Sequence, residues 1–183
     1  MSIAAIAILV VAAAVLSGLL VCRFMVYRGQ RVIICPETQQ PAGVELNAWR
    51  AARTPGDANL RLQSCSRWPE RHDCPQDCLA QIEASPDGTL VRNIVAAWYG
   101  NQQCVFCHRT IGTIEWHEAI PALRASDGTL KEWKGIAAED VPAILETHNA
   151  VCWNCNLTEG FRHEHPELVT DSAQTPLRDL AIH

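Results

Sequence analysis

The chain has 183 residues, of which 48% are hydrophobic and nine are cysteines, and its formal net charge is −5. Residues 32–183 carry 12 Lys and Arg against 20 Asp and Glu, a net charge of −8, with no basic run. Nucleic-acid binding normally requires clustered positive charge, so we expect no nucleic-acid partner.

The N-terminal stretch from Ile3 to Val21 contains no charged residue and consists almost wholly of Ala, Val, Ile and Leu. As a helix it spans roughly 30 Å, enough to cross the hydrocarbon core of a bilayer. Only Met1 and Ser2 precede it, whereas a cleaved secretory signal begins with a positively charged segment. The sequence therefore predicts a transmembrane anchor over residues 1–22, with a cleaved signal as the alternative.

Three arginines follow this stretch, Arg23, Arg28 and Arg31, and no Lys or Arg precedes it. The positive-inside rule therefore predicts a single-pass membrane protein with its N-terminus outside and its C-terminal domain in the cytoplasm. Residues 23–31 form a basic juxtamembrane linker that acts as the topology signal. Cytoplasmic thiols stay reduced, which favours metal ligation by the cysteines, whereas the opposite orientation would favour disulfides.

Residues 32–100 are predicted to form a first four-cysteine unit. The β-rich residues 31–36, the turn-like residues 37–41 and the alternating pattern after Gly43 predict a small hairpin with Cys35 on its first arm. Apolar residues at helical spacing predict an amphipathic bridging helix over 91–98 that ends at Gly100.

Four cysteines of this unit form a possible metal-ligand set: Cys35, Cys65, Cys74 and Cys78. Cys74 and Cys78 are four residues apart, so both would face one ion from the first turn of a helix that begins near Pro75. The spacing Cys-x8-Cys-x3-Cys matches no common zinc motif. We expect zinc here, and the alternatives are an iron–sulfur cluster, disulfides or unligated thiols.

Residues 101–168 are predicted to form a second four-cysteine unit, followed by a flexible tail over 169–183. We expect strands over 113–117 and 129–133, the latter entered through a turn at Asp127-Gly128. A short helix is expected from Ala138, with Asp140 as its N-cap, and a last helix is expected to start at the second cysteine pair.

Two Cys-x-x-Cys pairs dominate this unit, Cys104 with Cys107 and Cys152 with Cys155. Four thiolates can close a tetrahedron around one zinc ion. The order of knuckle, hairpin and helix resembles a treble-clef zinc finger over residues 102–166, and the resemblance implies that these four cysteines are its ligands. Treble clefs serve as binding modules, structural staples and nuclease cores, so the motif predicts a metal site better than an activity.

The same cysteines also lie in a pattern similar to that of HNH nucleases, which carry Asp-His-x-x-Pro between their two cysteine pairs. The resemblance implies that His117 would be a general base acting on water and that Asn149 would orient it or a catalytic metal. An extra residue separates His117 from Pro121, however, and Trp116 stands where a metal-binding acid belongs. We therefore expect no catalytic residue.

Together these features predict an α+β protein with a single N-terminal transmembrane helix, short hairpins and helices, and a treble-clef-like C-terminal unit. We expect a membrane-anchored zinc-binding scaffold or adaptor with two structural zinc ions, a protein partner and no catalysis. Complete tetrahedra leave no open coordination position for water or substrate. The alternatives are iron–sulfur electron transfer and HNH-like, metal-dependent hydrolysis.

Overall fold

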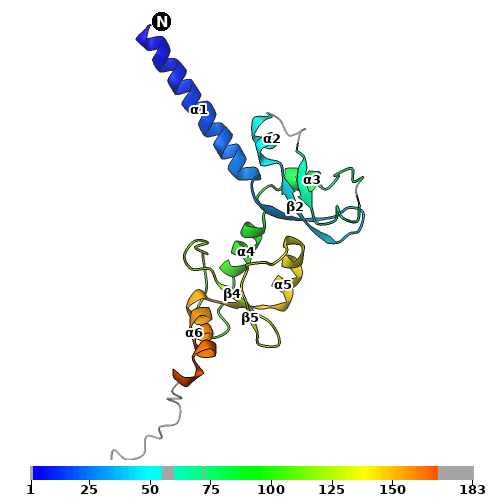
Figure 1. Ribbon diagram of the computed structural model, residues 1–183, viewed down its shortest axis with the longest axis vertical. Helices are drawn as coiled ribbons and strands as arrows, with labels where there is room; N and C mark the ends of the chain where they lie inside the picture. The colour runs from blue at the N-terminus through cyan, green and yellow to red at the C-terminus, as the bar shows by residue number, and fades with distance from the viewer. Residues whose placement is uncertain (1, 55–59, 72, 169–183) are drawn as a thin grey trace, which may run out of the picture.

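The computed structural model describes residues 2–54, 60–71 and 73–168. It is an α+β protein in which a long N-terminal helix projects from two small antiparallel sheets (Figure 1). The sheets belong to successive stretches of the chain, and helix α4 connects them.

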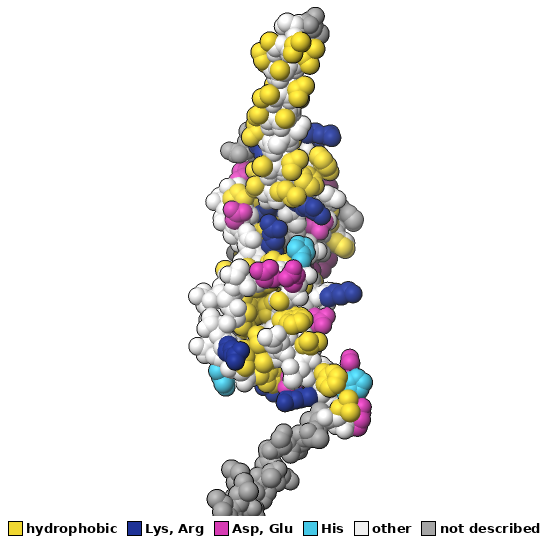
Figure 2. All heavy atoms as spheres, turned by 90° about the vertical axis from the view of Figure 1, so that its left-hand side faces the viewer, with side chains coloured by type: hydrophobic (Ala, Val, Ile, Leu, Met, Phe, Trp, Pro, Cys, Tyr) yellow, Lys and Arg dark blue, Asp and Glu magenta, His cyan; other side chains and the backbone are white. Residues whose placement is uncertain are grey.

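Helix α1 (Ile3–Tyr27) begins at Ser2, whose hydroxyl accepts the amide of Ala5 at 3.3 Å. None of its residues is buried, and its most apolar 18-residue window has a mean hydropathy of 2.8. Within the described ranges it is the one helix long and apolar enough to cross a membrane, a property that signal sequences share. Figure 2 shows its hydrophobic side chains exposed along its whole length.

The first sheet has the order β1-β2-β3, formed by β1 (Gln30–Ile34), β2 (Pro41–Leu46) and β3 (Leu62–Cys65). The predicted hairpin is confirmed, since β1 and β2 pair antiparallel and Ile34 lies opposite Pro41. Cys35 follows directly after β1. Helix α2 (Ala48–Arg53), which was not predicted, follows β2 and is capped by the Asn47 side chain.

The helix expected near Pro75 begins later, as α3 (Leu79–Ala84). Gln76 has a φ of 64°, a left-handed conformation that a right-handed helix cannot contain. The prediction that Cys74 and Cys78 share the first turn of one helix is therefore wrong, because Cys74 lies in the preceding loop and Cys78 at the N-cap.

Helix α4 (Val91–Gly100) confirms the predicted amphipathic helix. Its buried residues Val95 and Tyr99 join a core that also contains Val32 of β1 and Leu123 of the second sheet, so this core spans both units. Strand β2 also approaches the 3-10 helix η2 (Ala138–Asp140) closely at Gly43.

The second sheet has the order β5-β4-β6, formed by β4 (Ala122–Arg124), β5 (Leu130–Lys131) and β6 (Asn149–Val151). The strand expected over 113–117 is wrong: a turn closed by the isolated bridge of Glu115 with Ala119 occupies this region, and β4 replaces it as the first arm of the hairpin. The turn before β5 is confirmed, with Gly128 at a φ of 91°. Strand β6 was not predicted.

Helix α5 (Val141–Thr147) follows η2, and Asp140 stands at its N-cap position without a capping side-chain bond. Helix α6 (Trp153–Glu164) begins after Cys152, as expected, and continues through Gly160. A short 3-10 helix, η3 (Pro166–Leu168), ends the described chain. The predicted tail over 169–183 lies outside the described residues.

Arg31 is fully buried and joins the end of α1 to the first sheet. Its guanidinium donates to the carbonyl of Val26 at 2.5 Å, to Thr89 Oγ1 at 2.9 Å and to the carbonyl of Pro86. Removal from water lowers the pKa of this guanidinium from its ordinary value, against the opposing effect of Asp87. Of the three arginines that follow the apolar stretch, Arg31 therefore forms hydrogen bonds inside the protein and is not exposed beside the membrane helix.

Candidate metal centre

The structure brings the two Cys-x-x-Cys pairs together. The four Sγ atoms all lie within 4.8 Å of one another, and they belong to Cys104, Cys107, Cys152 and Cys155. Zinc with Zn–S bonds of about 2.3 Å requires tetrahedral edges of roughly 3.8 Å. The Sγ atoms of Cys107 and Cys152 are 3.8 Å apart, and all nine cysteines of the chain are free thiols. The donor set therefore fits a tetrahedral metal ion.

The first pair lies in a tight turn over residues 104–109. The amide of Cys104 donates to the carbonyl of Arg109 at 2.9 Å, and the amide of His108 donates to the carbonyl of Cys104 at 2.8 Å. His108 has a φ of 56°, in the left-handed region that glycine adopts most easily. The chain thus reverses within six residues, and both thiols reach the same site.

The second pair is positioned by the junction of β6 with α6. Cys152 is the N-cap residue of α6, and Cys155 lies in its first turn. The amide of Val105, inside the first turn, donates to the carbonyl of Ala150 in β6 at 2.9 Å. This bond fixes the first cysteine pair against the strand that leads to the second.

The thiol pKa values of Cys104 and Cys155 are strongly shifted, in opposite directions. Cys104 is completely buried, which by itself raises a thiol pKa, but the backbone amides of Cys107 and Cys152 point at its sulfur and lower the pKa to about 6. Burial and neighbouring sulfurs raise the pKa of Cys155 instead. The site thus favours a thiolate at Cys104, and thiolate sulfur is the donor that zinc and iron bind in such sites.

The first four-cysteine set is gathered but more open. Its members line one cavity of about 290 Å³ between the ends of β1 and β3 and the start of α3: Cys35, Cys65, Cys74 and Cys78. The two Cys-x-x-Cys pairs, Cys104 with Cys107 and Cys152 with Cys155, are called the Cys104 set below. Among the described residues, only this set has three or more ligand atoms mutually within 4.8 Å. The first set therefore surrounds a cavity without closing into a tetrahedron.

Cys35 lies in a turn that has the same backbone pattern as residues 104–109. Its amide donates to the carbonyl of Gln40 at 2.9 Å, the amide of Gln39 donates to its carbonyl at 2.8 Å, and Gln39 has a φ of 56°. Thr38 occupies the position that Cys107 occupies in the other turn. The amide and hydroxyl of Thr38 point at the Cys35 sulfur and hold the pKa of that thiol below its usual value.

Cys78 is the buried member of this set. Burial, followed by the neighbouring sulfurs of Cys74, Cys65 and Cys35, raises the pKa of its thiol to about 11. A metal bound here would therefore have to displace a firmly held proton.

The residues of the HNH-like pattern form no comparable site. His117 is exposed in the turn closed by Glu115 and Ala119, and Asn149 is exposed at the start of β6. His148 Nδ1 instead lies 2.9 Å from Thr147 Oγ1. In the part of the chain that the structure describes, His117 belongs to no cluster of three metal ligands.

The sequence predicted a turn after Cys35 but not its likeness to the turn at Cys104, because Thr38 interrupts the Cys-x-x-Cys signal. Pro36 and the polar residues after it indicated a turn, but the hydrogen bonds that define its type are visible only in three dimensions. Comparison of the chain with protein families, curated proteins and solved structures finds no match. The geometry of the two cysteine sets therefore carries the functional argument.

Proposed function

We propose that this chain is a membrane-anchored, zinc-binding scaffold whose cysteine-rich domain presents a surface to a protein partner. The closed arrangement of the Cys104 set carries this proposal, because four thiolates complete a tetrahedral zinc site and leave no position for water or substrate. Such a zinc ion is structural, and sites of this kind contribute on the order of 10 kcal/mol of apparent binding free energy, much of it to folding.

The anchor in this proposal is α1. Its 25 residues reach about 37 Å. None of them is buried, and only its last turns contact the described part of the domain, as expected for a helix whose apolar length is surrounded by lipid. The arginines after it favour an N-terminus outside and a domain in the cytoplasm. The reducing cytoplasm would keep the cysteines available as metal ligands.

The treble-clef assignment of the second unit is also part of the proposal. It is supported by the order along the chain of the turn at 104–109, the hairpin β4-β5, and α6 beginning at the second pair. In that arrangement the zinc ion joins a turn to the start of a helix 45 residues later, and the short hairpin between them depends on this connection.

A second zinc ion is proposed at the first set. Its support is the turn at Cys35, which repeats the hydrogen bonds and the left-handed residue of the turn at Cys104. The same cavity is lined by Cys65 at the end of β3, by Cys74 in the loop before α3, and by the buried Cys78. Binding of one ion by all four would require the walls of this cavity to close inward.

Elemental analysis of the full chain, purified in detergent, tests both sites. We expect two zinc ions and no iron per wild-type chain, and one zinc ion each for Cys104→Ser and Cys35→Ser. Cys22→Ser is the matched control, since Cys22 lies in α1 outside both sets, and it should retain two. Wild-type protein without zinc would refute the proposal, and a single zinc ion unaffected by Cys35→Ser would refute the second site alone.

An iron–sulfur cluster at the first set is the second candidate. The observation in its favour is the open cavity of about 290 Å³, which is wider than a closed tetrahedron needs. Clusters also accept irregular cysteine spacing. Electron transfer would then replace the scaffold role, and the purified protein would contain iron and absorb visible light.

A further inference from the structure

Helix α2 packs beside the last turns of α1 (Figure 1). The ring of Phe24 in α1 and that of Trp49 in α2 have their centroids 4.5 Å apart. The chain thus leaves α1, forms the first hairpin, and returns to the end of α1 at α2.

The length of α1 sets the level of this contact relative to a bilayer. A helix of 25 residues reaches about 37 Å, whereas the hydrocarbon core is roughly 30 Å thick. The uncharged part of α1 ends before Arg23, so the turns from Arg23 to Tyr27 extend into the headgroup layer. Because α2 contacts these turns, it lies at the same level.

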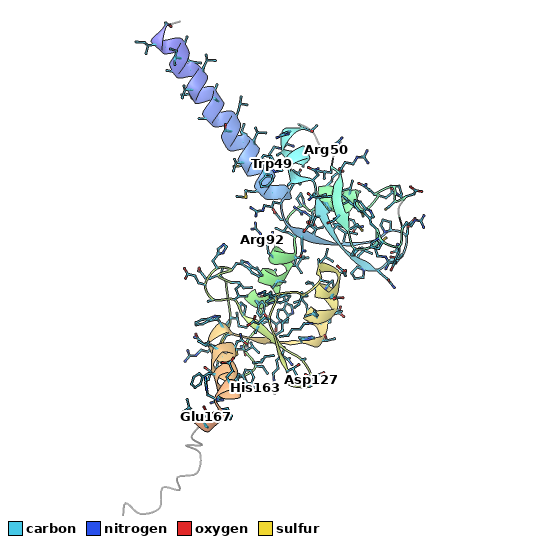
Figure 3. All side chains as sticks on the ribbon, in the orientation of Figure 1. Trp49, Arg50, Arg92, Asp127, His163 and Glu167 are labelled. Carbon is cyan, nitrogen blue, oxygen red and sulfur yellow. The ribbon has the colours of Figure 1, made fainter. Side chains whose placement is uncertain are left out.

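The two faces of α2 differ sharply. Ala48, Ala51 and Ala52 are buried against the domain, while the remaining face is exposed. On that face Trp49 is 60% exposed, and the Arg53 guanidinium lies 5.6 Å from its ring centroid. Figure 3 shows Trp49 and Arg50 near the C-terminal end of α1. Tryptophan and arginine are the residues that membrane interfaces favour.

This region is positively charged in an otherwise acidic domain. Residues 23–34 and 47–54 contain five arginines and no Asp or Glu. One of the five is the buried Arg31, and the others are Arg23, Arg28, Arg50 and Arg53. Within the described ranges none of these four forms an ion pair. Their charge is therefore available to an anionic surface.

We propose that the exposed face of α2 and the last turns of α1 form one membrane-binding platform. Trp49 inserts among the phospholipids next to Phe24, and Arg50 and Arg53 bind anionic headgroups. The inference rests on the proposed membrane anchor and adds a second, peripheral contact that holds the cysteine-rich domain against the bilayer.

Quenching of tryptophan fluorescence by brominated phosphatidylcholine tests the insertion of Trp49. The full chain is reconstituted into vesicles that contain the brominated lipid together with phosphatidylglycerol. We expect the quenched component, about one of the six tryptophans, to disappear in Trp49→Phe, which keeps an aromatic ring against Phe24. Trp153→Phe is the control, because Trp153 is also exposed but lies in α6. The Trp153→Phe protein should be quenched as much as wild type.

Hydrogen exchange of residues 47–54 tests the headgroup contact. Phosphatidylglycerol should increase the protection of α2, and each arginine lost should reduce that gain by about five-fold. Arg50→Gln/Arg53→Gln is therefore compared with the charge-matched control Lys131→Gln/Lys134→Gln, whose lysines lie at and after β5 in the second unit. The control should respond to phosphatidylglycerol as wild type does.

The outcomes separate this inference from the anchor on which it rests. A chain that alkaline carbonate extracts from the vesicles has no transmembrane anchor, and both proposals then fail. A chain that resists extraction but shows no loss of quenching in Trp49→Phe is anchored without the platform. Equal protection of α2 with and without phosphatidylglycerol would refute the headgroup contact and leave α2 available to a protein instead.

Discussion

Tyr99 shows how a single side chain organises the core that joins the two units. It is completely buried in α4, and its hydroxyl donates to the carbonyl of Ala122 at 2.7 Å while accepting the indole N–H of Trp133 at 3.2 Å. Burial raises the pKa of this hydroxyl, so it remains a donor at any physiological pH. Through these two bonds, Tyr99 connects α4 to β4 and to the segment that follows β5.

Tyr99→Phe should lower the free energy of unfolding by about 1–3 kcal/mol, because it leaves the carbonyl of the buried Ala122 and the half-buried indole N–H of Trp133 without their partner. Chemical denaturation followed by tryptophan fluorescence measures the loss. Tyr27→Phe, at the half-buried end of α1, is the control and should change stability less. A Tyr99→Phe protein as stable as wild type would show that these two bonds contribute nothing net.

At the scale of elements, the two units depend on the close approach of β2 to η2. A Cβ built on Gly43 would lie 3.0 Å from Ala138 Cβ and 3.4 Å from the amide of Glu139. The Glu139 carboxylate lies closer still but is the free end of a side chain, whereas the buried Ala138 could give way only with a small shift of η2. Glycine therefore fits this contact better than alanine would.

We expect Gly43→Ala to destabilise the protein by about 1–3 kcal/mol, since overpacking forces backbone shifts. Gly160→Ala is the matched control, because its Cβ would meet nothing within 4 Å and alanine is the better helix former. That variant should gain about 0.5–1 kcal/mol. Thermal unfolding of the two variants measured side by side should therefore shift in opposite directions, and shifts of the same sign would contradict this account of the contact.

At the scale of the whole molecule, the main core lies around α4 and α5, and the part of the second unit next to the candidate metal centre has only a small core of its own. The cluster next to the candidate centre contains three buried residues: Cys104, Ala122 and Val151. The strands around it have two or three residues each. Small units of this kind usually need a metal ion or disulfides for stability.

Removal of metal by a chelator should therefore abolish the near-UV circular dichroism of the packed tryptophans and leave the far-UV signal of α1. Added zinc should restore the signal in wild type, whereas Cys152→Ser should lack it from the start. The near-UV signal of Cys22→Ser should behave as in wild type. If elemental analysis shows that the zinc has gone while the near-UV spectrum is unchanged, the ion does not stabilise this unit.

The turns illustrate how far sequence can go and where it fails. That Cys104 and Cys107 lie side by side in one cluster was predictable, because their three-residue spacing acts locally, within one turn of backbone. The turn at Cys35 has the same hydrogen bonds, but its fourth residue is Thr38 and not a cysteine. The two turns therefore share a backbone conformation and not a residue pattern. The prediction of a strand over 113–117 was wrong because Glu115 pairs with Ala119 in a local turn and not with a neighbouring strand.

The sequence by itself determined the apolar helix, the first hairpin, helix α4 and the four cysteines that come together, because each depends on local periodicity or spacing. Only the tertiary structure decided that Cys35 shares a cavity with three distant thiols, that β6 completes the second sheet, and that α2 returns to the end of α1. Those contacts join segments far apart in the chain, so their free energy comes from packing and burial that no local pattern records.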